Sequence, residues 1–86
     1  QNYPNPFNPT TTIGYALPVG AEVTLTIYNV SGQQVRTFDR GHRAAGRYAI
    51  EWDGTADDGS AVATGVYLYK ITAGDFTSTR KMLLVK

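Results

Sequence analysis

Three aspartates in one polar stretch, Asp53, Asp57 and Asp58, are the residues of this chain best placed to do chemistry. Calcium favours several hard oxygen ligands from a turning loop, so the three carboxylates are a candidate cation site. Their spacing does not follow the D-x-[DN]-x-[DN]-G order of a calcium-binding loop, and no bidentate glutamate follows them. Aspartate beside glycine is also ordinary in turns, where its carboxylate accepts hydrogen bonds from backbone N–H groups. The sequence therefore favours turns over a bound metal, and it predicts no cofactor.

The other polar residues do not form a catalytic group. His42 is the single histidine and sits between Gly41 and Arg43 in a polar stretch. Catalysis by histidine needs a nucleophile and an orienting acid, and a metal site needs a cluster of ligands, so a solvated loop residue is the favoured interpretation. Glu51 falls on the outer face of its predicted strand, where nothing pairs with it across a pocket as glycoside hydrolysis requires. The sequence predicts that this segment is not an enzyme.

Aromatic residues offer a binding alternative. The chain holds six tyrosines and one tryptophan, and a planar row of such rings could bind sugar. Four of the tyrosines, and Trp52 with them, fall on the apolar faces of predicted strands, where aromatic packing is typical of a sandwich core. A carbohydrate-binding accessory module of a secreted glycosidase is kept as an alternative.

Hydrophobic alternation with a period of two predicts the elements that position these residues. Turn residues recur between the alternating runs, and no sustained helical period or internal repeat is apparent. Polar loops are predicted over 39–46 and 53–64, and Ser31-Gly32 is predicted as a turn. The predicted strands cover residues 10–17, 21–29, 33–38, 47–52, 65–72 and 76–85.

The last two predicted strands form a hairpin around Gly74-Asp75, which is expected to adopt a type II′ turn. A two-residue turn sets Tyr67 opposite Met82 and Tyr69 opposite Arg80. Six strands, or seven if part of the 53–64 loop pairs, predict an all-β, immunoglobulin-like antiparallel β-sandwich. Residues 1–9, with three X-Pro steps, are expected to be a stiff lead-in or linker that Phe7 anchors, and residues 10–86 the sandwich.

Composition excludes several functional classes. The chain has 86 residues, no cysteine and a net charge of +1. Its length predicts one domain. The balanced charge gives no electrostatic footprint for nucleic acid, and no run reaches the ~18 apolar residues of a membrane span. We expect neither nucleic-acid binding nor direct membrane insertion, and we expect a module from the end of a longer exported protein.

Several short segments follow one another in a characteristic order along the chain. They are Pro4-Asn5-Pro6-Phe7, Ser31-Gly32-Gln33, Gly46-Arg47-Tyr48, Trp52-Asp53-Gly54, Gly65-Val66-Tyr67 and Arg80-Lys81-Met82. This order resembles the C-terminal sorting domains of proteins exported by the type IX (Por) secretion system, and the immunoglobulin-like domain of the flagellar hook-capping protein is a close cousin.

The resemblance implies a delivery role. It implies a non-catalytic module that directs an upstream cargo domain of the same chain, through type IX translocon or sorting proteins, across periplasm and outer membrane to the surface or medium. A structural domain of a hook-capping protein is the second alternative. The family residues expected to be structural are Pro4, Asn5, Pro6, Phe7, Gly32, Gly46, Tyr48, Trp52, Asp53, Gly54, Gly65 and Tyr67.

The final strand is the expected recognition element. If it lies at a sheet edge, its backbone groups and alternate side chains can pair with a partner's strand, although sequence does not place it there. The residues of this hypothesis are Arg80, Lys81, Met82, Leu83, Leu84, Val85 and Lys86.

Overall fold

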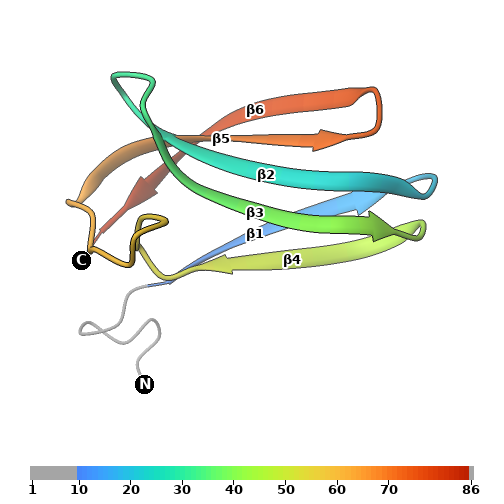
Figure 1. Cartoon of the computed structure of the whole chain (residues 1–86), viewed down its shortest axis with the longest axis horizontal. Coiled ribbons are helices and arrows are strands. Elements are labelled where there is room, and N and C mark those ends of the chain that lie inside the picture. Colours follow the sequence, from blue (N-terminus) through green and yellow to red (C-terminus); the bar gives the residue numbers. More distant parts are fainter. Residues whose placement is uncertain (1–9, 86) are drawn as a thin grey trace.

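The computed structural model describes residues 10–85, which form two antiparallel β-sheets stacked face to face (Figure 1). The smaller sheet pairs β1 with β4, and the larger sheet has the order β3-β2-β5-β6. The predicted immunoglobulin-like β-sandwich is therefore confirmed, with six strands. The strands are β1 (Thr11–Leu17), β2 (Ala21–Asn29), β3 (Gln34–Arg43), β4 (Gly46–Trp52), β5 (Gly65–Ala73) and β6 (Phe76–Leu84).

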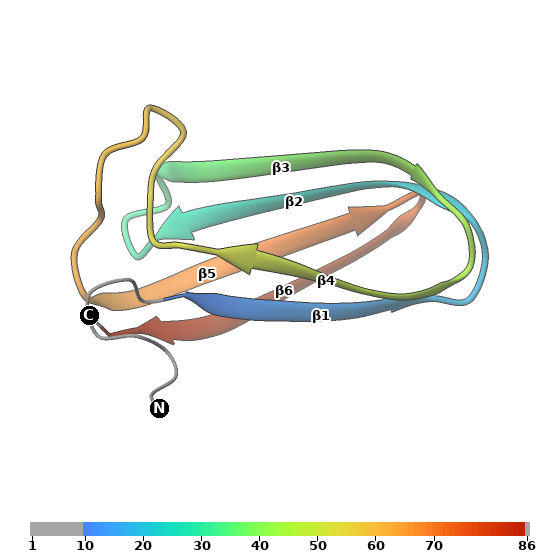
Figure 2. The ribbon, with the colours of Figure 1, turned by 90° about the horizontal axis from the view of Figure 1, so that it is seen from below.

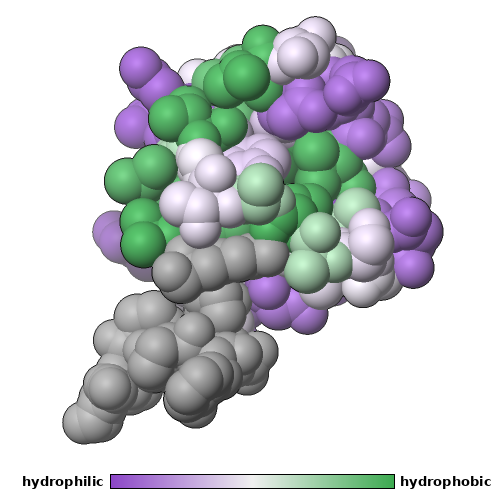
Figure 3. Space-filling model, turned by 90° about the vertical axis from the view of Figure 1, so that its left-hand side faces the viewer, coloured by the Kyte–Doolittle hydropathy of each residue, from purple (hydrophilic) through white to green (hydrophobic). Residues whose placement is uncertain are grey.

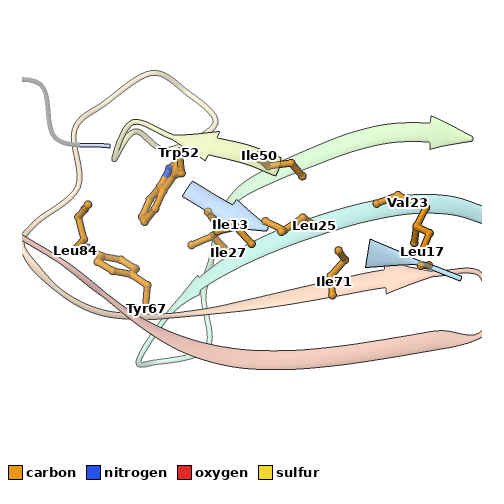
Figure 4. Packing of buried hydrophobic residues seen from close by; sticks show 11 residues of the cluster. Ile13, Leu17, Val23, Leu25, Ile27, Ile50, Trp52, Tyr67, Ile71 and Leu84 are labelled. Carbon is orange, nitrogen blue, oxygen red and sulfur yellow. The ribbon is translucent and has the colours of Figure 1, made fainter. Parts of the chain in front are cut away.

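Alternation builds the core. In β2, the side chains of Val23, Leu25 and Ile27 are fully buried, while the residues between them face outward. Successive side chains of a strand point to opposite faces, so one face of each sheet is apolar and the two apolar faces pack together. Figure 4 shows these side chains meeting between the layers.

One aromatic pair joins the sheets at the end where the chain leaves β4. Trp52 of the smaller sheet has an exposed fraction of 0% and meets Tyr67 of β5 edge to face, with ring centroids 5.3 Å apart. Leu84 lies beside them (Figure 4). Such aromatic pairs add about 1 kcal/mol to the free energy of unfolding beyond the area they bury.

Two strands begin with the same five-residue pattern, Ala-x-Gly-x-Tyr, which the sequence analysis missed. It covers residues 44–48 at the start of β4 and residues 63–67 at the start of β5, and the last three residues of each pattern lie in the strand. In both, the tyrosine hydroxyl donates a hydrogen bond to the backbone carbonyl four residues earlier: Tyr48 to Ala44 and Tyr67 to Ala63. Each tyrosine therefore fixes the corner through which its strand enters the sheet, as tyrosine corners do in related sandwiches.

The structure corrects the predicted loop over 39–46. β3 runs on to Arg43, so residues 39–43 are strand and pair with β2. Opposite Val23 and Thr24, β3 has a bulge in which Arg40 is the extra residue, next to Gly41, whose φ is 62°. The Asp39 carboxylate accepts a hydrogen bond from the Gly41 N–H. Polar residues fit here because β3 forms a sheet edge and needs no continuous apolar face.

The β5–β6 hairpin has the predicted register. Tyr67 pairs with Met82 and Tyr69 with Arg80. Gly74 has a φ of 60°, and no non-glycine residue within 10–85 has a positive φ. This combination fits the expected type II′ turn and excludes type I′, which would also need a positive φ at Asp75.

The smaller sheet is narrower than the larger one. β1 lies on the side where β6 forms the edge, and β4 lies nearer to β3 (Figure 2). β1 begins and β6 ends at the same end of the sandwich (Figure 1).

Candidate interaction surface

β6 lies at an edge of the larger sheet, which answers the question that the sequence left open. The residues predicted for recognition divide between its two faces. Lys81, Leu83 and Val85 are exposed on the outer face, whereas Met82 and Leu84 turn inward and pack on the core. Arg80 also faces inward but stays exposed. Lys86 lies outside the described residues, and the role of this strand in recognition remains a prediction.

Apolar side chains gather at the end of the sandwich where the chain leaves β6. Val66 of β5 and Leu83 of β6 are paired across the strands, and both are exposed. Val85 and, in the β2–β3 turn, Val30 are exposed there as well. Figure 3 views this end and shows hydrophobic side chains grouped among polar ones. This surface consists of side chains that packing inside the domain does not use.

A hollow runs along the open side of the sandwich between β1 and β6. We call it the open groove. It has a volume of about 400 Å³, and a smaller hollow of about 170 Å³ continues it past Leu17 and Val19, with Phe76 shared by both. The open groove is lined by Ile13, Gly14, Tyr15 and Ala16 of β1, Tyr69 and Ile71 of β5, and Phe76, Ser78 and Arg80 of β6.

Two of the three candidate metal-binding aspartates serve turns, and the third contacts β3. One carboxylate oxygen of Asp53 accepts hydrogen bonds from the Thr55 hydroxyl at 2.6 Å and the Thr55 N–H at 3.2 Å. Asp58 is bonded in the same way to Ser60, whereas Asp57 accepts from the Thr37 N–H. No group of three His, Cys, Asp or Glu residues within 10–85 is arranged to hold a metal ion. At Asp53 and Asp58 the arrangement is that of Asx turns.

Hydrogen bonds lower the pKa values of two of these carboxyl groups. The Thr55 hydroxyl, with smaller contributions from the Thr55 N–H and the Arg36 guanidinium, lowers the pKa of Asp53 below its ordinary value. The Ser60 hydroxyl and N–H lower the pKa of Asp58. Both groups are therefore held in their ionised form, in which a carboxylate accepts these bonds best.

The 53–64 loop covers part of the β3 edge. The Asp57 N–H donates to the Val35 carbonyl at 2.9 Å, and the Thr37 N–H donates to the Asp57 carboxylate at 3.0 Å. Arg36 reaches from β3 into the same loop and donates to the Thr55 hydroxyl at 2.7 Å. Backbone groups of β3 that would otherwise be open to a foreign strand are thus satisfied within the chain.

The family residues that the structure describes lie at turns, corners and the core. Gly32 has a φ of 85° in the β2–β3 turn, where the Asn29 side chain accepts hydrogen bonds from the N–H groups of Ser31 and Gln33. Gly54, with a φ of 79°, follows Asp53 in the first turn of the loop. Trp52 donates its indole N–H to the Thr55 carbonyl. Pro4, Asn5, Pro6 and Phe7 lie outside the described residues.

Other candidates are placed away from any shared site. His42 lies in strand β3, not in the loop that was predicted, with its Nδ1 3.8 Å from Oε2 of Glu22. Glu51 is exposed on β4. Tyr15 and Tyr48 stack on each other at 5.4 Å, and Trp52 and Tyr67 are buried. Four of the rings thus pack in two pairs, one in the core and one at the partly exposed surface.

Comparisons with known proteins identify the relatives of this sandwich. The family model of the FlgD Ig-like domain matches residues 7–76. The basal-body rod modification protein FlgD of Escherichia coli (strain K12) is 42% identical over 67 residues, which cover 77% of this chain and 29% of that protein.

Two solved structures share the fold. FlgD from Pseudomonas aeruginosa superposes with a TM-score of 0.70 at 25% identity, over 87% of this chain and 58% of that chain. FlgD from Xanthomonas campestris, described for hook capping essential for flagellar assembly, gives 0.69 at 23% identity, over 90% and 56%. The chain spans less than two thirds of the length of each relative.

These matches correct the delivery role inferred from the sequence. The family that matches is the FlgD Ig-like domain, and the relatives are FlgD proteins, so the assignment to type IX sorting domains is wrong. The predictions that the partners are type IX translocon proteins and that export follows the type IX route depended on that assignment and are wrong as well. The shared Trp52-Asp53-Gly54 and Gly65-Val66-Tyr67 segments explain the error, because the two families had been recognised by the same residues. No helix within 10–85 has the length and hydropathy to cross a membrane.

Proposed function

This chain belongs to the FlgD Ig-like domain family, and on that premise we propose that it is a structural domain of a flagellar hook-capping protein. The observation that carries the proposal is the family match over residues 7–76, which takes in β1 to β5 and therefore most of the sandwich. The X. campestris relative is described in terms of hook capping essential for flagellar assembly. The proposed partners are accordingly other proteins of that assembly, outside the cytoplasm.

The surface of the domain suits a contact role. Asp53 and Asp58 are engaged in turns, Trp52 and Tyr67 pack on each other, and the β3 edge is partly covered by the 53–64 loop. Among the described residues, the edges of β1 and β6 and exposed apolar side chains such as Leu83 stay open. Such a domain holds a shape and presents a surface, and we propose that it performs no catalysis and needs no cofactor.

A domain exchange tests this function. The segment of E. coli FlgD that aligns with this chain is replaced by the whole chain, and the hybrid is expressed in cells that lack their own FlgD. We expect hooks to be assembled and swimming in soft agar to be restored at least in part.

The matched control is the same hybrid carrying Trp52→Ala, which removes the buried ring between the sheets and is expected to cost about 3–5 kcal/mol of stability. That hybrid should fail to support hooks. If the hybrid with the native sequence accumulates in folded form and is exported, yet no hooks form, the proposal is wrong.

A further inference from the structure

The narrow sheet leaves one inner face of the sandwich uncovered. The residues of β6 that point toward the smaller sheet differ in burial along the strand: Phe76 is 62% exposed and Arg80 is also exposed, whereas Leu84 is 2% exposed. In a sandwich such inward side chains are normally covered by the opposing sheet. Here the opposing sheet has two strands, and the position of a third strand beside β1 is the open groove.

Both strands that border this position are edge strands. β1 pairs with β4 alone, and β6 with β5 alone, among the strands of residues 10–85. An edge strand presents a row of unpaired backbone N–H and C=O groups, which is the template for addition of another strand. On the opposite side of the molecule the β3 edge is partly covered, because Asp57 forms hydrogen bonds with backbone groups of Val35 and Thr37.

The chemistry of the open groove defines what fits it. Among the described residues, its lining is mainly aliphatic and aromatic, with the hydroxyl of Ser78, one cation, Arg80, and no carboxylate. No ion pair within the described chain involves Arg80. A strand that meets this lining therefore needs apolar side chains near Phe76 and a carboxylate near Arg80.

We infer that the open groove binds an extended, carboxylate-bearing segment of another protein chain, which adds beside β1 as a third strand of the smaller sheet. The inference rests on the proposed function, because a structural domain needs a surface for its neighbours in the assembly. Running antiparallel to β1, the added strand meets Phe76, Ser78 and Arg80 with successive inward side chains. Backbone hydrogen bonds to β1 supply affinity, and the pair with Arg80 supplies selectivity.

A second copy of this domain is a poor occupant. The edge strands β1 and β6 of a copy hold no carboxylate that could pair with Arg80 in the open groove. Pairing with β3 of a copy brings in Arg36 and Arg40, on an edge that is already partly covered. The charge of the edges therefore favours a different chain with acidic residues.

Binding of a designed strand tests the inference. The probe is a synthetic peptide as long as β1, seven residues, in which threonines alternate with valine, valine and glutamate, so that these three share one face. Backbone amide shifts of the ¹⁵N-labelled chain are followed up to about 1 mM peptide, and the same peptide is also fused through a flexible glycine–serine linker to reach a comparable effective concentration. We expect shifts and slowed amide exchange in β1, with side-chain shifts at Phe76.

Charge variants make the test specific. Arg80→Glu should weaken binding of the glutamate peptide about tenfold and restore binding to a peptide with lysine in that place. Lys70→Glu is the matched control, because Lys70 is exposed on the outer face of the same sheet and pairs with Thr79. Its affinity for the glutamate peptide should stay within about twofold of that of the parent chain.

Several outcomes would overturn the inference. They are absence of shifts in β1 with both free and fused peptide, equal binding of the glutamate and lysine peptides, and shifts confined to β3. Dimerisation of the chain that protects β1 would instead make a second copy the occupant. The assay reads the open groove directly, so it can fail while the domain exchange in E. coli succeeds, and the reverse outcome is equally distinguishable.

Discussion

At the scale of single residues, the two tyrosine corners differ in burial although they share a sequence pattern. The hydroxyl of Tyr67 bonds to the Ala63 carbonyl in a partly buried setting, and that of Tyr48 bonds to the Ala44 carbonyl at the exposed surface. Water can replace a lost hydrogen bond at the exposed corner but not readily at the buried one. The same five-residue pattern is therefore expected to contribute unequally to stability.

Tyr67→Phe should lower the free energy of unfolding by about 1 kcal/mol, because it leaves the Ala63 carbonyl without its donor. Tyr48→Phe, the matched change, should cost less than half of that. Urea denaturation followed by tryptophan fluorescence measures both. Equal losses in the two variants would show that burial does not determine how much each tyrosine hydrogen bond contributes to the free energy of unfolding.

Acid should weaken the first turn of the 53–64 loop. Because the pKa of Asp53 is lower in the folded chain than its ordinary value of 3.8, its ionised form stabilises the fold above that pH. This contribution is lost as the pH falls through the folded-state pKa. Asp53→Asn should therefore destabilise the chain at pH 7 by less than about 1 kcal/mol, and the difference from the parent chain should shrink below pH ~4.

The cause of this shift can be checked separately. Thr55→Ala removes the hydroxyl that makes the largest contribution, so the pKa of Asp53 in an NMR titration should move back toward 3.8. An unchanged pKa in Thr55→Ala would mean that another group holds the carboxylate in its ionised form.

At the scale of elements, the two edge strands of the larger sheet differ in how far the rest of the chain covers them. A loop that follows β4 returns to cover β3, whereas β6 is left open. This cover depends on contacts between residues about twenty positions apart, such as Thr37 and Asp57. Hydrophobic alternation carries no information about such contacts, so sequence reasoning could describe 53–64 only as an irregular loop.

Asp57→Ala should open the covered part of β3. The Thr37 N–H then loses its acceptor, and its hydrogen exchange is expected to accelerate about tenfold, while the backbone bond from Asp57 to Val35 is kept. Asp58→Ala is the control, since its carboxylate bonds to Ser60 and not to β3. Equal exchange of Thr37 in both variants would contradict a specific role for Asp57.

The strands themselves were largely predictable. Where one face is buried, as in β2, alternation determines which residues are in the core, and the Gly74-Asp75 turn determines the register of β5 against β6. The extension of β3 to Arg43 was missed because an edge strand with polar side chains has no such alternation. The edge position of β6 depends on the order of the strands in the sheet, which short-range patterns do not contain.

At the scale of the whole molecule, the sequence predicted the fold correctly but the family wrongly. The segments around Trp52 and Tyr67 identify a sandwich of this type because they build its core and corners. They do not distinguish two families that share this architecture. The type IX assignment relied on these shared segments together with two at the ends of the sequence, Pro4–Phe7 and Arg80–Met82, and the family match of 7–76 covers little of those two. The residues of the core and the corners thus identify the fold, but they do not identify the biological process in which the domain takes part.

The position of the chain ends gives the domain a mechanical character. β1 begins and β6 ends at one end of the sandwich, so a force applied between these two strand ends acts there. Such a force would load the Thr11–Trp52 and Gly65–Leu84 pairs first, and then each following pair of β1 and β6 in turn. Hydrogen bonds loaded in sequence break at lower force than the same bonds loaded together. The domain would therefore unfold one strand pair at a time at low force, and it would lengthen under tension.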